Sequence, residues 1–395
     1  MNVVEIEDEH GPQTYQKFPV TIVRGSGAEV WDEKGNAYID CMGGYGVAIV
    51  GHCNIDVVAA IKAQAERLIT CHGSLYNDAR AAFLETLARH APTGLDAAFL
   101  SNSGAEANEV AIKLAKRFTG KRTIIAMKGA FHGKTAGALS ATWNKKYKDP
   151  FEPLLSTFKH VEFGNLQELE SAIDGDTSAV MLEPIQGEGG IIMPPEGYLK
   201  GVREICDRRG ILLIADEIQT GLGRTGKLWA CDNWGVTPDI MTAAKGLAGG
   251  VPIGATLARK EVLHSLKKGE QTSTFGGNPL ACAAGSATLE YISKHDLPGQ
   301  ALSKGRLFQD SLRTLLGHHR SGREVRGIGL MLAMEMRVDI HDILLNSIRE
   351  RVLFTYSGRT VVRLLPPLVI SEAQIGKVIG VLDRVLSEQE LKQAG

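Results

Sequence analysis

Short apolar runs alternate with amphipathic segments from about residue 55 onward, and this alternation constrains the fold most strongly. Apolar runs of this length are typical of strands that are covered on both faces. Strands that alternate with helices form a mainly parallel sheet between helix layers, so the sequence predicts an α/β fold. The predicted strands cover residues 97–100, 123–127, 179–182, 211–215, 240–242 and 253–258.

Two of the intervening segments show the helical period clearly. Apolar side chains recur on one face from Ala107 to Phe118, and Gly120 follows as a residue that can end a helix. Residues 199–206 keep the same spacing and are followed by Gly210. We therefore expect a helix in each segment.

The pattern changes at both ends of the chain. Residues 28–31 and 37–40 flank a Lys-Gly-Asn turn and predict a hairpin. After about residue 290, the pattern predicts a smaller α+β domain whose helices and strands cover residues 302–316, 324–326, 330–335, 361–364 and 373–386. We expect an N-terminal segment (1–50) that forms part of this smaller domain, a large domain (51–290) and a C-terminal small domain (291–395).

The charge balance gives no reason to expect a nucleic-acid or membrane partner. The 44 basic and 45 acidic residues leave a net charge of −1. No run approaches the roughly 18 apolar residues that a membrane-spanning helix needs, and the acidic start does not resemble a secretory signal. Six scattered cysteines without a Cys-x-x-Cys pair predict free thiols in the cytoplasm and no structural metal site.

The segment Ser101-Asn-Ser-Gly-Ala-Glu-Ala-Asn108 follows a predicted strand and opens a predicted helix. The first turn of a helix has unpaired N–H groups and partial positive charge, so it can hold a phosphate. Ser103 can add a hydroxyl group, while Gly104 and Ala105 allow close approach. An ordinary helix cap in a tight turn explains the same residues.

Asp216 ends an apolar strand in Ile214-Ala-Asp-Glu-Ile-Gln-Thr-Gly. Ligands of open α/β sheets bind just outside this edge, and a carboxylate there needs a positive partner. A protonated pyridine nitrogen is such a partner. A metal-binding pair of Asp216 and Glu217 is the alternative, although no matching histidine cluster is evident.

Lys245 lies among small and apolar residues after another predicted strand. Such surroundings disfavour the ammonium form, and the neutral amine is the nucleophile that forms imines. The glycine-rich stretch behind it leaves room for a planar ring. A lysine that extends to the surface is the alternative.

Two further segments contain candidate ligand-binding residues. Phe131 and His132 follow a predicted strand, where Phe131 can stack on a ring or simply fill the core. The segment Thr272-Ser-Thr-Phe-Gly-Gly-Asn-Pro279 offers hydroxyl and backbone N–H groups for a phosphate, or forms a simple turn.

Taken together, these motifs resemble the class III (ω-amino acid) aminotransferases of fold type I. The resemblance covers nearly the whole chain, and it also includes Glu-Pro-Ile-Gln-Gly-Glu-Gly-Gly and Arg-Leu-Leu-Pro-Pro. It implies a large domain with a mainly parallel seven-stranded sheet, a smaller α+β domain and pyridoxal 5'-phosphate as the cofactor.

The resemblance also implies residue roles. Lys245 would form the Schiff base, and Asp216 would pair with the pyridine nitrogen. The other implied cofactor-binding residues are Gln219 at the ring oxygen, Phe131 and Ile218 on the ring faces, His132, and Ser103, Gly104 and Ala105 at the phosphate. Thr274 from the other subunit would also reach the phosphate, which makes a homodimer the expected active unit.

Within the family, the chain is similar to acetylornithine aminotransferases and to enzymes that act on an ω-amino acid attached to the small acidic carrier protein LysW. The segments that carry the second similarity are residues 141–147, 150–154 and 360–368. The expected reaction moves an amino group between glutamate/2-oxoglutarate and the ω-end of a carrier-linked lysine or ornithine. An N-acetylornithine, succinyl-diaminopimelate or ornithine aminotransferase is the alternative.

Substrate binding is implied at four positions. Arg363 would hold the α-carboxylate of glutamate, and Glu188 would pair with this arginine when that carboxylate is absent. Lys134 stands where these relatives have an arginine for the distal carboxylate, so the charge is kept but the bidentate fork is lost. Ser273 would contact substrate from the partner subunit.

Two other classes of protein fit the same scaffold. An aminomutase or a decarboxylase would use the same cofactor without needing 2-oxoglutarate. A non-catalytic binding protein would need no reactive lysine.

Overall fold

The computed structural model describes residues 3–394, and its larger sheet has seven strands in the order β4-β10-β9-β8-β7-β5-β6. Strands β6, β5, β7, β8 and β9 are parallel, whereas β10 is antiparallel to β4 and β9. The predicted mainly parallel sheet is therefore confirmed. Its strands are β4 (Ala97–Ser101), β5 (Thr123–Met127), β6 (Phe158–Val161), β7 (Thr177–Leu182), β8 (Leu212–Asp216), β9 (Ile240–Ala243) and β10 (Gly254–Ala258).

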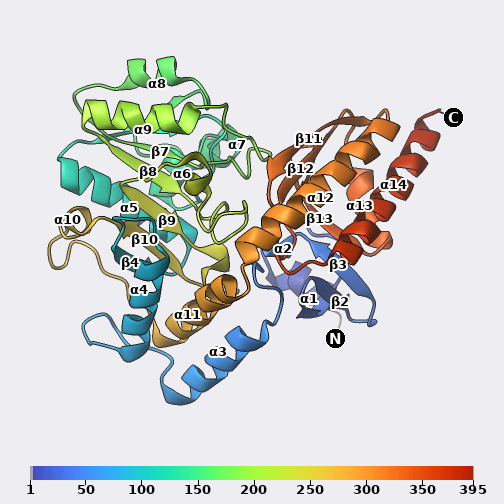
Figure 1. Cartoon of the computed structure of the whole chain (residues 1–395), viewed down its shortest axis with the longest axis horizontal. Coiled ribbons are helices and arrows are strands. Elements are labelled where there is room, and N and C mark those ends of the chain that lie inside the picture. Colours follow the sequence, from blue (N-terminus) through green and yellow to red (C-terminus); the bar gives the residue numbers. More distant parts are fainter. Residues whose placement is uncertain (1–2, 395) are drawn as a thin grey trace.

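Helices cover both faces of this sheet (Figure 1). On β5, Ile125 packs in one buried cluster with side chains of α9, while Ile124 packs in another with side chains of α5. Because neighbouring residues of a strand point to opposite faces, both faces are buried and the strands are almost wholly apolar. The helices of this part are α3 (Ile55–Arg67), α4 (Asp78–His90), α5 (Gly104–Thr119), α6 (Ala136–Ala141), α7 (Lys145–Lys148), α8 (Leu166–Ala172), α9 (Tyr198–Arg209), α10 (Lys260–Leu263) and α11 (Pro279–Lys294).

The second sheet joins the two ends of the chain. Its order is β1-β2-β3-β13-β14-β12-β11, and the parallel pair β3/β13 connects the N-terminal strands to the C-terminal ones. This pairing supports our proposal that residues 1–50 belong with residues 291–395. The strands are β1 (Ile22–Ser26), β2 (Glu29–Asp32), β3 (Ala37–Cys41), β11 (Gly322–Ile328), β12 (Met331–Met336), β13 (Val352–Ser357) and β14 (Val361–Leu364).

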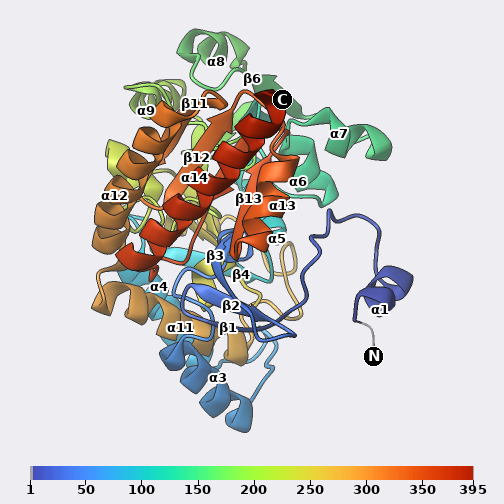
Figure 2. The same ribbon diagram turned by 90° about the vertical axis from the view of Figure 1, so that its right-hand side faces the viewer.

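The remaining helices lie in this smaller part or near the N-terminus. Helix α1 has no buried residue and lies apart from both sheets (Figure 2). These helices are α1 (Val3–His10), α2 (Gly43–Gly46), α12 (Leu297–His318), α13 (His341–Arg349) and α14 (Glu372–Ala394). No helix in the described part of the chain combines the length and apolar composition that crossing a bilayer requires.

Three strands were not expected from the sequence. Strands β1 and β6 lie at sheet edges, where one side has no strand partner and the burial pattern is weak. Strand β13 is largely buried in the middle of its sheet, but its apolar run follows directly on α13 and gives no separate signal. The expected strand boundaries otherwise differ from the observed ones by one or two residues, as is usual at element ends.

Candidate active site

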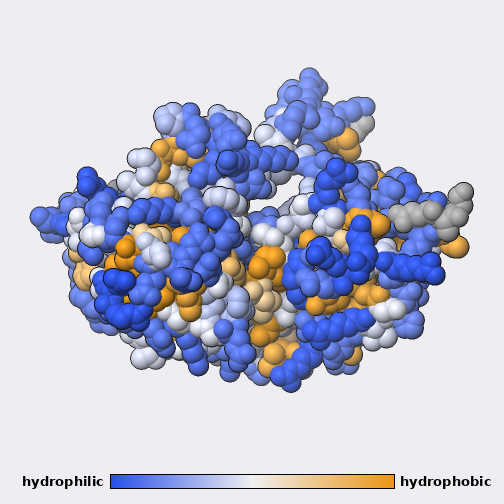
Figure 3. Space-filling model, turned by 90° about the horizontal axis from the view of Figure 1, so that it is seen from above, coloured by the Kyte–Doolittle hydropathy of each residue, from blue (hydrophilic) through white to orange (hydrophobic). Residues whose placement is uncertain are grey.

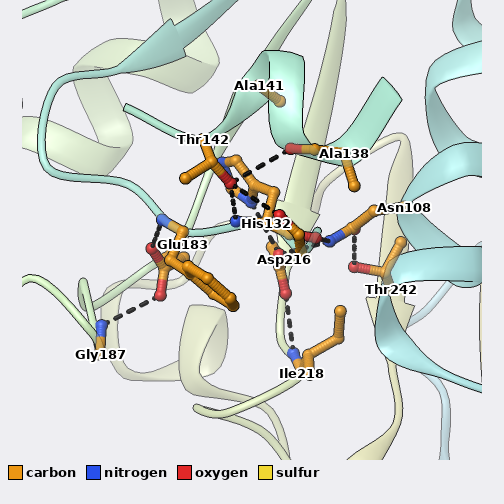
Figure 4. Close-up of polar contacts among 12 residues, drawn as sticks. Asn108, His132, Ala138, Ala141, Thr142, Glu183, Gly187, Asp216, Ile218 and Thr242 are labelled. Carbon is orange, nitrogen blue, oxygen red and sulfur yellow. Dashed lines mark hydrogen bonds and ion pairs between the residues drawn. The ribbon is translucent and has the colours of Figure 1, made fainter. Parts of the chain in front are cut away.

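Asp216 is the last residue of β8 and is only 3% exposed. Figure 4 shows its carboxylate among polar groups from three other elements. Asn108 Nδ2 donates to Oδ2 at 2.8 Å, the backbone N–H of Ile218 donates to Oδ1 at 3.1 Å, and His132 Nδ1 lies 2.7 Å from Oδ2. Thr242 in turn donates to Asn108 at 2.9 Å. These contacts offset the cost of burying the carboxylate.

His132 lies directly against Asp216 instead of presenting an open face. Burial alone would lower the pKa of His132, but the hydrogen bond and the charge of Asp216 raise it above 6.5. Its Nε2 is buried and has no hydrogen-bond partner among the described residues. The backbone N–H of His132 donates to the Thr142 hydroxyl at 2.9 Å, which holds the His132 backbone near Asp216.

Glu183 is a second buried carboxylate that braces the Phe131 loop. It accepts the backbone N–H groups of Phe131 at 2.9 Å and of Gly187 at 3.0 Å (Figure 4). Burial raises the pKa of Glu183 to about 7, although His132 opposes the increase.

Lys245 begins the short turn after β9 and is only partly exposed. Its φ of +47° is rare for a residue with a side chain and is usually found where function constrains the backbone. Burial lowers the pKa of Lys245 below 10.5, against the opposing effects of Glu188 and Asp216. A lower pKa increases the fraction of neutral, nucleophilic amine.

The start of α5 forms a close-packed cradle. Ser103 caps the helix and accepts the N–H of Glu106 at 3.2 Å. A Cβ on Gly104 would come within 2.8 Å of the Ile218 side chain, and a Cβ on Gly133 would come as close to Ala105. Small residues are therefore needed here, and the first turn of the helix offers N–H groups to an anion.

Arg363 and Glu188 form an ion pair at the other side of the site. Arg363 is fully buried, and its Nη1 lies 2.9 Å from Glu188 Oε1. Burial on its own would raise the pKa of Glu188, but Arg363 and then Lys245 lower it below 4.5. The same guanidinium donates to the backbone of Gly187 and Tyr356, each at 3.0 Å.

The remaining predicted residues lie nearer the surface. Lys134 is exposed, with its Nζ 4.7 Å from the ring centre of Tyr147. Ser273 accepts from Asn102 at 3.3 Å, so its loop lies beside the start of α5 in the same chain. Thr274 is exposed in that loop, and its contact with a second subunit stays a prediction.

The family model for class-III aminotransferases matches residues 10–386. The chain belongs to the class-III aminotransferase family. It is 47% identical to an acetylornithine aminotransferase of Methanopyrus kandleri over 97% of this chain and 98% of the relative. It is 44% identical to the [LysW]-aminoadipate semialdehyde transaminase of Deinococcus radiodurans, over 96% and 89% of the two chains.

Among solved structures, the aminotransferase resembles ornithine aminotransferase from Toxoplasma gondii with a TM-score of 0.95 and 35% identity, over 98% of this chain and 95% of that one. An acetylornithine aminotransferase from Elizabethkingia anophelis aligns with a TM-score of 0.88 and 32% identity, over 98% of each chain. The predicted family, fold type and aminotransferase activity are therefore confirmed.

The aminotransferase uses pyridoxal phosphate, and its residues fit this cofactor. The glycine-containing start of α5 suits a phosphate, and Asp216 suits a positively charged ring nitrogen. Gln219 Oε1 is buried without a partner among the described residues, which leaves an amide for a polar ring substituent. Within residues 3–394, no group of three or more His, Cys, Asp and Glu side chains could hold a metal ion.

Sequence reasoning missed four residues of this site. Asn108 and Glu183 contact Asp216 or its surroundings, and both stood within quoted motifs where a buried polar residue could have been suspected. Tyr147 and Tyr45 lie near the Arg363–Glu188 pair. Their positions depend on distant segments meeting, which no local pattern reveals.

Proposed function

We propose that this aminotransferase moves an amino group between glutamate/2-oxoglutarate and the ω-amino/semialdehyde end of a lysine or ornithine linked to the acidic carrier LysW. The reaction belongs to lysine and arginine biosynthesis. The relative from Deinococcus radiodurans carries a name for this activity, and one from Sulfurisphaera tokodaii, 41% identical, is named for both LysW-linked semialdehydes.

The second candidate is aminotransfer to a free small molecule, above all N-acetylornithine, with succinyl-diaminopimelate or ornithine as variants. Relatives named acetylornithine aminotransferase favour it, with identities of 47% and 43% in Methanopyrus kandleri and Methanothermobacter thermautotrophicus. Both candidates share the same ω-amine chemistry and differ in what is attached to the far end of the substrate.

The single observation that carries the ω-amine chemistry of both candidates is the ion pair of the buried Arg363 with Glu188, near Lys245. Glutamate has a carboxylate next to its reacting amine, whereas an ω-amine has none. An arginine that binds the first substrate would be left unpaired by the second, which is costly in a buried site. Glu188 supplies a carboxylate for Arg363 when the substrate does not.

The remaining roles follow from the contacts. Pyridoxal phosphate supplies a ring that accepts electrons from the substrate carbon. Asp216 keeps the ring nitrogen protonated, and His132 and Asn108 hold Asp216 in place. Lys245 would hold the cofactor and carry the proton to and from the substrate carbon, because burial lowers its pKa and so increases the fraction of neutral amine.

The same residues are proposed to contact the cofactor as the family resemblance implies. Phe131 and Ile218 would lie on the two faces of the ring, and Gln219 would bind the ring oxygen. Ser103, Gly104 and Ala105 hold the phosphate. For the substrate, Lys134 and Ser273 bind the distal group.

The proposal includes a homodimer. Arg80 donates to the backbone of Cys71, Leu75 and Gly277, so segments 68–76 and 275–280 lie side by side. Five large apolar side chains are exposed on them, and such a patch indicates a protein interface. They are Leu68, Ile69, Leu75, Tyr76 and Phe275. The patch borders Thr274, which fits a second copy of this chain whose phosphate site Thr274 completes.

The proposal also includes a cytoplasmic location. All six cysteines are free in the structure, as expected of a protein from a reducing compartment.

A comparison of kcat/KM decides between the two substrate classes. The purified enzyme is given N-acetylornithine, LysW-linked ornithine and LysW-linked lysine, each with saturating 2-oxoglutarate. We expect the carrier-linked compounds to be preferred. A strong preference for N-acetylornithine would sink the carrier proposal, and failure to form glutamate from 2-oxoglutarate would instead favour an aminomutase or a decarboxylase.

A further inference from the structure

Tyr147 lies between the cofactor site and the exposed Lys134. It belongs to the short helix α7, and its half-buried ring meets Phe131 edge-to-face, with centroids 6.0 Å apart and planes at 82°. The backbone of Phe131 is fixed by Glu183. The Tyr147 ring therefore packs against the loop that is proposed to contact the cofactor.

The ammonium group of Lys134 lies over one face of the Tyr147 ring. Lys134 Nζ lies 4.7 Å from the ring centre, within the range of a cation–π contact. No carboxylate among residues 3–394 lies within ion-pair distance of Lys134, so its ammonium group keeps its capacity to bind an anion from outside the chain. The aromatic ring attracts the ammonium group without neutralising its charge.

Tyr147 also lies near enough to the Arg363–Glu188 ion pair for both charges to act on its hydroxyl group. Burial raises the pKa of Tyr147, Glu188 adds to the increase, and Arg363 opposes it. Tyr147 therefore lies near both cations that are proposed to bind substrate carboxylates, Arg363 for the proximal one and Lys134 for the distal one.

A lysine at position 134 has a specific weakness. Its ammonium is a point charge on a flexible four-carbon chain, whereas an arginine presents a planar fork. Ordering that chain costs side-chain entropy at the moment of binding unless the free protein already restricts it. An aromatic ring under the ammonium group supplies such a restriction.

We propose that Tyr147 is a positioning residue that holds the Lys134 ammonium over the site, and so determines recognition of the substrate's distal carboxylate. The inference rests on the proposed function, because it takes the ω-amine substrate to carry that carboxylate. The interaction acts through the ring and not through the hydroxyl group.

The test compares two substrates that differ only in the distal carboxylate. N-acetylornithine has it, and N-acetylputrescine, the decarboxylated form, lacks it. The measured quantity is kcat/KM for N-acetylornithine divided by kcat/KM for N-acetylputrescine, both in the holoenzyme. This ratio reports the contribution of the distal carboxylate. The variants are Tyr147→Leu, which removes the ring, Tyr147→Phe, which keeps it, and Lys145→Ala, an exposed control on the same helix.

We expect Tyr147→Leu to lower this ratio about two- to fivefold, the range of an exposed cation–π contact. Tyr147→Phe and Lys145→Ala should keep the wild-type ratio. In a Lys134→Ala background, Tyr147→Leu should have no further effect on the ratio, because the two residues form one unit.

Other outcomes separate the possible failures. If Tyr147→Leu slows both substrates equally, or if Tyr147→Phe acts like Tyr147→Leu, the ring does not position Lys134 and the inference is overturned. A wild-type ratio near one would show that the enzyme does not recognise the distal carboxylate, and so would contradict the role proposed for Lys134. A wild-type enzyme that transfers no amine from any ω-amino substrate to 2-oxoglutarate would refute the proposed function.

Discussion

At the scale of single residues, the site depends on buried charges that are each held by several partners. Asp216, Glu183, Glu188 and Arg363 are all largely removed from water and lie within one small region. Buried charges are costly unless paired, so their retention points to a chemical role and not to stability. The role of each group can be tested by a substitution that changes either its shape or its charge and keeps the other.

Replacing Arg363 by lysine should separate the two half-reactions. Arg363→Lys keeps a positive charge near Glu188 but cannot form a bidentate pair with the α-carboxylate of glutamate. We expect KM for glutamate to rise roughly 10- to 100-fold, and KM for an ω-amine to change little, because that substrate has no carboxylate at this position. Steady-state kinetics with each amino donor measure both effects. An equal rise for both donors would contradict the assignment of Arg363.

Glu183 gives a prediction about pH and stability. Its folded pKa of about 7 exceeds the ordinary 4.5, so the unfolded chain loses this proton first as the pH rises. The contribution of Glu183 to the free energy of unfolding is therefore present below pH 4.5 and is lost as the pH rises to 7. Glu183→Gln cannot titrate, so its Tm should fall less across this window.

The substituted amide must face two backbone N–H groups, so Glu183→Gln should lower Tm at every pH. The informative quantity is therefore the slope of Tm against pH between 4.5 and 7. Parallel wild-type and variant curves would show that Glu183 does not titrate in this range.

At the scale of elements, helix α5 is the best example of how local sequence builds the site. Ser103 caps its start, and Gly120 ends it in the left-handed conformation with φ of +68°. Between them, the apolar face packs on the large sheet. The helix is thus fixed at both ends, with its first turn directed at the site.

Gly104 at the start of α5 should be intolerant of even one methyl group. In Gly104→Ala the new Cβ would lie 2.8 Å from Ile218 Cδ1, so the Ile218 side chain would have to leave the position proposed to contact the cofactor ring. We expect the Kd for pyridoxal phosphate to rise about 2- to 10-fold, the cost of a displaced rotamer. The matched control is Gly317→Ala in α12, where nothing lies within 4 Å of the added Cβ. Similar affinities in the two variants would contradict the packing argument.

At the scale of the whole molecule, the smaller part of the chain closes the site from one side. Ser357 donates to the backbone of Glu188 at 2.6 Å, and Arg326 donates to that of Gly190 at 2.9 Å. Arg363, in the same sheet, binds Gly187 and Glu188. Three residues of the second sheet therefore hold the loop that carries Glu188.

The surface has one feature that a single chain does not explain. Figure 3 shows a largely hydrophilic face with scattered hydrophobic patches. The exposed apolar side chains on segments 68–76 and 275–280 are concentrated next to Thr274. In the proposed homodimer, a second copy of the chain would bury these side chains. Thr274 of each subunit would then reach the cofactor site of the other.

Phe275→Asp should weaken that dimer. A carboxylate buried in an apolar interface is costly, so the variant should run as a monomer in size-exclusion chromatography with light scattering. Its activity should fall together with its dimer content. Leu391→Asp, at an exposed apolar residue near the C-terminus, is the control and should leave the mass unchanged. A wild-type enzyme that is active as a monomer would contradict the proposal.

The sequence by itself determined the layers of the fold and the places of Asp216 and Lys245, the two residues proposed to be catalytic. Buried strands and amphipathic helices depend on periodicities of two and 3.6 residues, which a single sequence displays. Asp216 and Lys245 each end or follow such a strand, so their place at the sheet edge could be predicted from neighbouring residues alone.

Only the tertiary structure decided how distant groups meet. His132 lies 84 positions from Asp216, and Glu188 lies 175 positions from Arg363, yet each pair is in contact. The ring of Tyr147 beneath Lys134 is likewise invisible in the local pattern. Periodicity records which side of an element faces the core, but hydrogen bonds and ion pairs depend on side-chain positions that are fixed only when the elements pack.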